Sequence, residues 1–336
     1  MEAVIGTIAL DSALAGITSW AGTDRAGALP YAQSLEKRRV AAGGLAAYAF
    51  RMAPEFWRRV SADAKRPVEP APRVPQIKDW PKTGLHAAWI GHSTVMIGID
   101  GFNILTDPVF SARIGINLGP LTLGIKRLVE PAIRIPELPK PDLILLSHAH
   151  MDHFDLPSLR SLENRSITVV TAAGTSDLLR TKRYGTVREL RWDESVHVGP
   201  ILVRAFEVNH WGARMRSDTH RSFNGYEIEA GRYRVIFGGD TAYTDSFRQL
   251  RRSTPVHLAI MPIGAYDPWI RMHCTPEQAL SMADQAGAEF ILPVHHRTFE
   301  LSREPRGEPM DRLLAASRSA RDRVCIRDFG QEFHLN

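Results

Sequence analysis

The sequence has few of the features that define several large classes of protein. Its two cysteines, Cys274 and Cys325, match neither a zinc-finger spacing nor a disulfide framework. No apolar run reaches the length of about 20 residues that a membrane-spanning helix needs. The apolar start of the chain is interrupted by Asp11 and lacks the basic residues that open a signal peptide. We therefore expect a protein of the reducing cytoplasm that is not exported.

The composition is that of an ordinary globular protein. The 336 residues are 44% hydrophobic and 24% charged, which is enough to bury a large core. The net charge of +5 is mild, and a solvated basic surface explains it. The alternative is that the positive charge attracts anionic substrates or a membrane surface. We find no internal repeat.

Prolines divide the chain into three parts. Residues 1–66 are rich in alanine and arginine and are predicted to form a helical extension. Residues 67–75 contain four prolines, so the segment 67–84 is expected to be an extended connector. The main domain then spans 85–336. The extension either covers a face of that domain or contacts a membrane surface or a second subunit, and the sequence leaves the oligomeric state open.

The segment Ser147-His148-Ala149-His150-Met151-Asp152-His153 carries the clearest chemical signal. It follows the apolar run 143–146, which we predict to be a buried strand. His148 and His150 are two residues apart and therefore point the same way, whereas Asp152 and His153 lie around the bend. Imidazole and carboxylate groups suit zinc, and also iron or manganese. The alternative is a histidine-rich surface turn that has no specific metal-binding function.

Three further apolar runs each end at a residue that could complete a metal site. The runs 202–209, 234–239 and 290–294 are predicted strands, and they precede His210, Asp240 and His295. Taken singly, Asp240 could cap a helix, and either histidine could be a hydrogen-bonded core residue. Together with the histidine motif they predict a site that holds two metal ions at the edge of a sheet.

These residues, taken together, resemble those of a known family. The residues His148, His150, Asp152, His153, His210, Asp240 and His295, in that order, resemble the metal ligands of the metallo-β-lactamase superfamily. The segments 88–97, 105–111, 237–243 and 263–268 resemble its branch of N-acylphosphatidylethanolamine-hydrolysing phospholipase D and bacterial relatives. The similarity covers about residues 85–300. It implies an α/β fold, a four-layer αββα sandwich, for the catalytic domain.

The resemblance also implies a role for each ligand. His148, His150 and His210 would hold the first of two divalent ions, expected to be zinc, while Asp152, His153 and His295 would hold the second. Asp240 would bridge the two. Water between two such cations loses a proton near neutral pH, so hydroxide is the expected nucleophile, and no serine or cysteine nucleophile is required. Asp152 and His273 are the predicted catalytic residues.

Several residues outside the ligand set are candidates for supporting roles. His273 precedes Thr275 and Gln278, which form the capping box of a helix predicted over 276–286. The resemblance implies that His273 faces the active site and binds substrate or protonates the leaving group; a solvated loop residue is the alternative. Asp107 is expected to orient a ligand imidazole, or else only to form a turn before proline.

One departure from the family pattern concerns the last ligand. Members of the branch commonly have His-Trp-Gly-Thr there, whereas this chain has His295-His296-Arg297-Thr298. Arg297 would add bulk and positive charge near the metals, and His296 is a second candidate beside the ligand. Tyr266 is a weaker candidate for substrate contact. For His92 we expect a packing role.

The remaining predictions concern secondary structure. Helices are also expected over 156–164, 176–184, 244–252 and 310–320. The segment 110–139 shows no clean period, and its apolar and basic residues, including Arg127 and Arg134, are expected to form either a pocket wall or a loop that covers the sheet.

These observations favour a metal-dependent hydrolase of a phosphodiester, such as an N-acylated phospholipid. A lactonase or other carboxyl-ester hydrolase is the alternative, because the same hydroxide attacks a carbonyl carbon. A redox enzyme of the superfamily is disfavoured because such members usually carry glutamate where this chain has His150. A nuclease is disfavoured because the interval from His153 to His210 leaves no room for a nucleic-acid domain. The expected partner is a small-molecule or lipid ester and no nucleic acid, with peripheral membrane contact left open.

Overall fold

The computed structural model describes residues 63, 65–118, 121–215, 217–317 and 322–336. The chain forms two compact units, residues 1–67 and 68–336, and all the strands described below lie in the second. The helical extension predicted over 1–66 lies almost entirely outside the described residues, so the predicted domain boundaries stay a prediction. In the described part of the chain, no helix is both long and apolar enough to cross a membrane.

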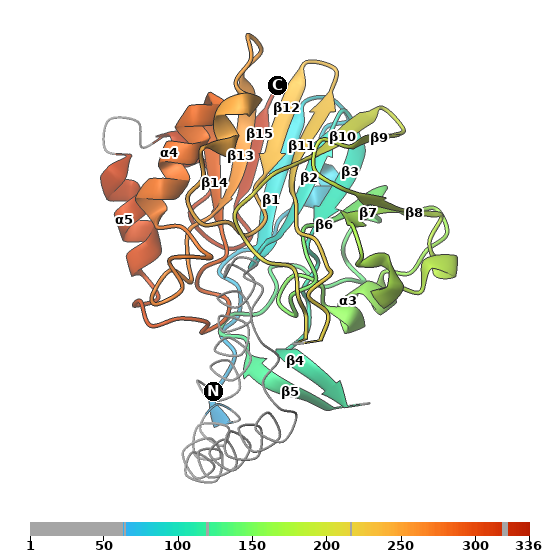
Figure 1. The fold of residues 1–336 in the computed structure, drawn as a ribbon, viewed down its shortest axis with the longest axis vertical. Helices are drawn as coiled ribbons and strands as arrows, with labels where there is room; N and C mark the ends of the chain where they lie inside the picture. The colour runs from blue at the N-terminus through green and yellow to red at the C-terminus, as the bar shows by residue number, and fades with distance from the viewer. Residues whose placement is uncertain (1–62, 64, 119–120, 216, 318–321) are drawn as a thin grey trace, which may run out of the picture. The chain divides into compact units, whose positions relative to one another are not determined.

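Two β-sheets form the centre of the domain. The strands of the first are β1 Leu85–Gly91, β2 Thr94–Ile99, β3 Phe102–Thr106, β6 Leu143–Leu146, β7 Thr168–Ala172, β8 Thr186–Leu190 and β15 Glu332–Leu335. Those of the second are β9 Ser195–Val198, β10 Ile201–Phe206, β11 Gly225–Ala230, β12 Tyr233–Phe237, β13 Val256–Pro262 and β14 Ala288–Val294. The orders are β15-β1-β2-β3-β6-β7-β8 and β14-β13-β12-β11-β10-β9, and Figure 1 shows the two sheets facing each other.

The core follows from the alternation of side chains along each strand. In β1, Leu85, Ala87 and Trp89 belong to the cluster between the sheets, whereas Ala88 and Ile90 belong to the cluster on the outer face. All five are buried, so both faces of this sheet are covered. Such a strand is apolar throughout, and β6, with the sequence LILL, shows the same pattern.

Helices cover the outer face of each sheet. On the first sheet, α3 (Leu156–Ser161) adds Leu159 to the cluster that contains Ile144 of β6. On the second, α4 (Pro276–Ala286) packs Met282 into the cluster that contains Met261 of β13, and α5 (Glu308–Ala316) joins the same cluster. Figure 1 shows α4 and α5 beside β13 and β14 and α3 near β7. The predicted αββα sandwich is confirmed.

The helix predictions met different outcomes. The helix over 276–286 is confirmed to the residue, with the capping box of Thr275 and Gln278 in place. The helix predicted over 176–184 is wrong, because only the 3-10 turns η2 (Ser176–Leu178) and η3 (Thr181–Arg183) form there. The buried Tyr184 side chain donates its hydroxyl to the Leu159 carbonyl and holds this segment against α3.

Two other predicted helices differ in type or length. The segment 244–252 forms the 3-10 helix η4, Asp245–Leu250, instead of an α-helix. Its buried residues Phe247 and Leu250 are three apart, the spacing at which a 3-10 helix places side chains on one face. The helix predicted over 310–320 is α5, which begins two residues earlier and ends at Ala316. Residues 318–321 lie outside the described part of the chain.

The segment predicted to be irregular contains a β-hairpin. Its strands are β4 (Arg113–Leu118) and β5 (Leu121–Lys126), which form a two-stranded sheet of their own within the described part of the chain. Gly115 lies opposite Gly124, and a Cβ atom on Gly115 would stand 2.2 Å from the Leu123 carbonyl oxygen. The two backbones therefore approach more closely than a pair of larger residues would allow. Figure 1 shows this hairpin extending beyond the lower ends of the two sheets.

Candidate metal centre

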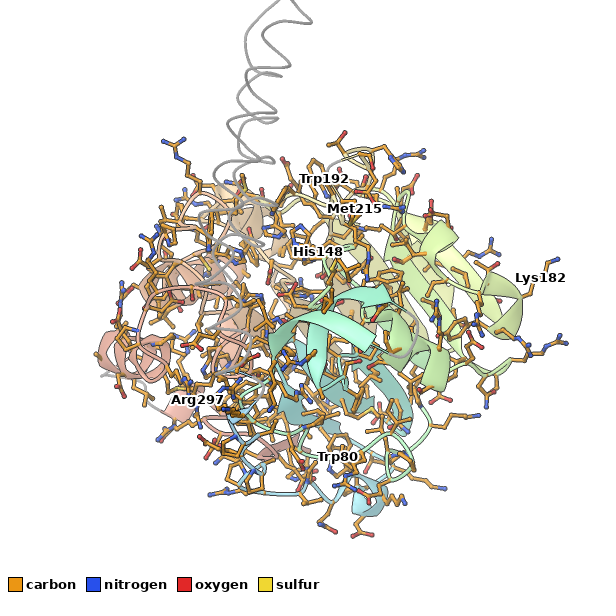
Figure 2. The ribbon with its side chains drawn as sticks, turned by 90° about the horizontal axis from the view of Figure 1, so that it is seen from below. Trp80, His148, Lys182, Trp192, Met215 and Arg297 are labelled. Atoms are coloured by element: carbon orange, nitrogen blue, oxygen red, sulfur yellow. The ribbon has the colours of Figure 1, made fainter. Side chains whose placement is uncertain are left out.

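The predicted ligands come together at the edge of the sandwich where four strands end. His148 follows β6 by two residues, and His295 follows β14 directly. Asp240 lies three residues beyond β12. Figure 2, which views the molecule from below, shows His148 near the middle of this side.

The route to His210 differs from the prediction. The strand predicted over 202–209 ends at Phe206, and the chain continues as a loop. An isolated bridge between Asn209 and Ala242 then fastens this loop beside Asp240. Thus two segments that follow different strands are held together by backbone hydrogen bonding, and His210 and Asp240 meet.

Three imidazoles form the first group of candidate ligands. His148 Nε2 lies 2.8 Å from His150 Nδ1, which lies 3.3 Å from His210 Nε2. A tetrahedral zinc ion with Zn–N distances of about 2.0–2.1 Å places its ligand atoms roughly 3.3 Å apart. The three nitrogens therefore have the spacing of ligands that share one ion.

The second group combines two imidazoles with two carboxylates. Asp240 Oδ2 lies 3.0 Å from both His153 Nε2 and His295 Nε2, and Asp152 Oδ2 lies 3.4 Å from His295 Nε2. The same Asp240 oxygen is 4.0 Å from His148 Nε2 and 3.8 Å from His210 Nε2. Asp240 thus stands between the two groups, as a bridging ligand would.

Hydrogen bonds on the far sides of the rings fix which nitrogen faces the site. Ser147 Oγ donates to Asp107 Oδ2, so it accepts from His148 Nδ1 at 2.8 Å. Asp107 also accepts from His153 Nδ1, and the Met272 carbonyl accepts from His210 Nδ1. In each case the remaining Nε2 lone pair is directed into the cluster, as metal ligation requires.

The buried atoms of the cluster test whether cations fit. His153 Nε2, His295 Nε2 and Asp240 Oδ1 are buried and have no partner in hydrogen-bonding geometry among the described residues. Burying acceptors without partners is costly, and a divalent cation satisfies several lone pairs at once. The groups His148–His150–His210 and His92–Asp152–His153–His295 each have the ligand number to hold an ion. The residues therefore fit metal cations.

The electrostatics of the two groups differ. Burial, followed by neighbouring histidines, lowers the pKa of His150 to about 3, and burial lowers the pKa of His210 to about 4. These rings are neutral, as ligands must be. Burial also acts to lower the pKa of His295, but the charges of Asp240 and Asp152 outweigh it and raise the pKa to about 9. The carboxylate side of the site therefore favours positive charge.

His273 lies beside the bridging carboxylate. Its Nδ1 is 3.8 Å from Asp240 Oδ2, and its ring centroid is 5.1 Å from that of His210. The His273 side chain is 12% exposed, whereas the candidate ligand imidazoles of His210 and His295 are almost fully buried. It therefore borders the cluster on a side that a ligand can reach.

The other predicted substrate residues lie elsewhere. Arg297 binds Asp328 Oδ1 at 2.8 Å and stacks over Phe329, so its charge is directed away from the cluster, and Figure 2 shows it far from His148. The Tyr266 hydroxyl donates to Glu308 on α5. His296 is buried and stacked on the Trp89 ring, and neither of its nitrogens has a hydrogen-bond partner among the described residues.

Two residues support the cluster in ways that the sequence analysis did not predict. His92, for which we expected packing, directs Nε2 to Asp152 Oδ2 at 3.0 Å. The buried Arg214 donates to the carbonyls of Ala149 and Phe154 and so holds both ends of the motif loop. No local pattern marks either one, because both contacts join segments about 60 residues apart in the sequence.

Replacing Asp107 with asparagine tests whether Asp107 orients His153 in the second group of candidate ligands. Asp107 is fully buried and accepts from Ser147 N, Ser147 Oγ and His153 Nδ1. Asparagine has the same size, but its amide NH2 is itself a donor and cannot accept hydrogen bonds from these three groups. We therefore expect metal affinity to fall about 10–100-fold. The measurement is a competition titration with a metal-sensitive chelator. Asp100→Asn, in the turn between β2 and β3, is the matched control, and equal affinity in both variants would refute the role.

The sandwich and its edge cluster define the class of metal-dependent hydrolases that share the metallo-β-lactamase fold. The family model described as the beta-lactamase superfamily domain matches residues 102–296. The chain belongs to this family, and it is a metal-dependent hydrolase.

Several proteins are similar in sequence to this chain, and two of them are phospholipases D by name. An uncharacterized protein of Mycobacterium tuberculosis is 34% identical over 278 residues, 80% of this chain and 74% of that protein. The N-acyl-phosphatidylethanolamine-hydrolyzing phospholipase D 1 of Caenorhabditis elegans is 31% identical over 69% of both chains. The mitochondrial enzyme of that name from Saccharomyces cerevisiae is 31% identical over 74% of this chain and 56% of the yeast protein.

Solved structures share the fold at low identity. A metallo hydrolase of the archaeon Ignicoccus hospitalis superposes with a TM-score of 0.57 at 18% identity, covering 76% of this chain and 99% of that one. An isothiocyanate hydrolase from Delia radicum gut bacteria gives 0.60 at 16% identity, covering 75% and 99%. The predicted family and fold are therefore confirmed.

Proposed function

We propose that this protein is a dinuclear zinc phosphodiesterase that acts on an N-acylated phospholipid. The observation that carries the proposal is the pair of ligand groups joined at Asp240 Oδ2, which lies 3.0–4.0 Å from ring nitrogens of four candidate ligand histidines. The choice of substrate is supported by the similarity to the phospholipases D of Caenorhabditis elegans and Saccharomyces cerevisiae. Zinc is supported by the ligand set, which contains imidazole and carboxylate and no thiolate.

The residues divide the work of hydrolysis among them. When bound, the cations supply Lewis acidity, which lowers the pKa of a coordinated water and stabilises negative charge on a phosphoryl oxygen. The three Nδ1 hydrogen bonds to Ser147, Asp107 and Met272 keep the ligand rings in a fixed tautomer and orientation. The site therefore needs little reorganisation during the reaction.

His92 and His273 have different roles in this arrangement. His92 Nε2 donates to Asp152 Oδ2 and so holds that carboxylate in place. His273 has no such constraint, since its Nδ1 has no hydrogen-bond partner among the described residues. We assign it to the substrate side, where it gives a proton to the departing alcohol oxygen.

A side-by-side assay tests the substrate class. The purified protein is given a bis-aryl phosphodiester, an N-acylated phosphatidylethanolamine, a plain phosphatidylethanolamine and an acyl lactone. We expect kcat/KM on the N-acylated phospholipid to exceed that on the lactone by at least about a hundredfold, which equals roughly 2.7 kcal/mol of differential transition-state binding. A preference for the lactone would replace the phosphodiesterase proposal with the lactonase alternative.

The proposal has a corollary for location. A lipid ester in the cytoplasmic leaflet would bring a cytoplasmic enzyme to a membrane surface, without a spanning helix. Nucleic acid is not among the expected substrates.

A further inference from the structure

The turn that follows β1 brings His92 to the metal centre. The His92 side chain is 1% exposed, and its Nε2 lies 3.0 Å from Asp152 Oδ2. Its ring also packs on the ring of His295, with centroids 4.2 Å apart. Both neighbours belong to the second group of candidate ligands, so the position of the His92 ring bears directly on that group.

The backbone of this turn has an unfavourable conformation. His92 has a φ of 52°, in the left-handed region that residues other than glycine seldom adopt. A residue stays in that region only when its surroundings hold it there. The His92 carbonyl accepts hydrogen bonds from His295 N at 3.1 Å and from Trp89 Nε1 at 2.8 Å. The buried His92 N–H donates to Thr298 Oγ1 at 2.7 Å.

The segment that follows β14 has the same kind of backbone. His295 and Arg297 have φ values of 62° and 59°. Thr298 comes next and is fully buried, and its carbonyl accepts from Leu128 N at 2.7 Å. The Thr298 hydroxyl donates to the His296 carbonyl at 3.3 Å. Thr298 is therefore held firmly through both its backbone and its side chain.

The Thr298 hydroxyl joins these two segments, which come from different sheets. β1 belongs to the first sheet and β14 to the second (Figure 1). The oxygen accepts from His92 N while its proton is donated to the His296 carbonyl. Without this oxygen the buried His92 N–H has lost its acceptor, which is costly in a protein interior. The turn is then free to relax, and the His92 ring moves with it.

The first group of candidate ligands is held in another way. The Ser147 hydroxyl and the Met272 carbonyl accept from two of its rings. In the described part of the chain, the side-chain hydrogen bond and the ring contacts that join His92 to candidate ligands reach Asp152, His153 and His295. Those three residues all belong to the second group, so a change at the His92 turn should affect the two groups unequally.

We propose that Thr298 is a positioning residue for the second of the two ions: its hydroxyl fixes the His92 turn, and His92 fixes Asp152. The proposal rests on the proposed pair of cations. It gives Thr298 no contact with metal or substrate, and it requires only the oxygen of the side chain.

The test compares zinc binding by variants of the full-length chain. Titration against a zinc-sensitive chelator gives the two affinities, and anomalous difference peaks from crystals at limiting zinc assign them to the two sites. Thr298→Val keeps the shape without the oxygen, so we expect it to bind the second ion about tenfold more weakly and the first ion as the wild type does. This is the low end of the range for removing a hydrogen-bond partner of a metal ligand.

Two variants are controls for this measurement. Thr298→Ser keeps the hydroxyl and should bind both ions like the wild type. Thr175→Val removes the hydroxyl of another fully buried threonine, which donates to the Ala172 carbonyl in the turn after β7. It should also leave both affinities unchanged.

His92→Asn tests the other end of the link, and it decides the matter if Thr298→Val yields no folded protein. Asparagine adopts left-handed backbone more readily than most residues, but it is too short to replace the imidazole Nε2 beside Asp152. We expect the same selective loss of the second ion.

Three results would overturn the proposal. The first is wild-type affinity for the second ion in Thr298→Val or in His92→Asn. The second is an equal fall of both affinities, and the third is an equal fall in Thr298→Ser and Thr298→Val; either would make Thr298 a residue of the general fold. A wild-type protein that binds no zinc would overturn the proposed function as well, so the two failures are distinguishable.

Discussion

Asp240→Asn should lose most of its bound metal and nearly all of its hydrolase activity. Asp240 is buried, and its Oδ2 lies within 4.0 Å of ring nitrogens of His148, His153, His210 and His295. Asparagine keeps the shape but removes the negative charge that both ligand groups share. The loss should exceed the roughly 10–100-fold that follows removal of an outer partner of a metal ligand. Elemental analysis and kcat/KM on an aryl phosphodiester are the measurements.

A nearby carboxylate supplies the control for this variant. Asp245 lies five residues further along, on η4, and its exposed side chain pairs with Arg248. Asp245→Asn should keep two ions per chain and wild-type activity. If Asp240→Asn also kept both, Asp240 would not be a ligand.

His273→Gln should reduce turnover without removing metal. A positioned proton donor typically contributes about 10²–10⁴-fold to the rate, and glutamine cannot donate a proton to the leaving oxygen. The effect should depend on the leaving group: large for an alkyl alcohol, which must be protonated, and small for p-nitrophenolate, which leaves unaided. The measurement is kcat for one alkyl and one p-nitrophenyl phosphodiester, with the metal content of each preparation.

His197→Gln is the matched control, because His197 is an exposed histidine on β9. An equal fall of kcat for both leaving groups would argue against proton donation. Loss of metal from His273→Gln would indicate that His273 is a metal ligand instead. This check is needed because His273 Nδ1 lies only 3.8 Å from Asp240 Oδ2.

The sequence was most informative where the decisive signal is local. The apolar run before the histidine motif is β6, and the capping box before 276–286 starts α4 where predicted. Each depends on residues within a few positions of one another, so the pattern is visible without the fold. The same holds for Asp240 and His295, which follow the ends of β12 and β14.

The sequence was least informative where a contact joins distant segments. His92 forms a hydrogen bond with Asp152, which lies 60 positions away in the sequence, and no local pattern around His92 predicts this bond. Arg297 was expected near the metals because it neighbours His295, but its positive φ of 59° and its bond to Asp328 turn it elsewhere. Adjacency along the chain does not fix side-chain direction once the strand has ended.

The hairpin shows a third kind of difficulty. The alternation of Ile114, Ile116 and Leu118 is a strand pattern, but glycines occupy two of the positions between apolar residues, so the polar contrast is weak. Strand pairing through Gly115 and Gly124 becomes evident only when both strands are placed side by side.

Binding of two cations by seven side chains is the basis of the proposed function, and one measurement tests it directly. Crystals of the protein purified without added chelator are to be measured on both sides of the zinc absorption edge, with elemental analysis of the same preparation. We expect two anomalous peaks, one among His148, His150 and His210 and one among Asp152, His153 and His295, with Asp240 between them. The absence of any peak at these residues, even after soaking in a divalent metal salt, would contradict it.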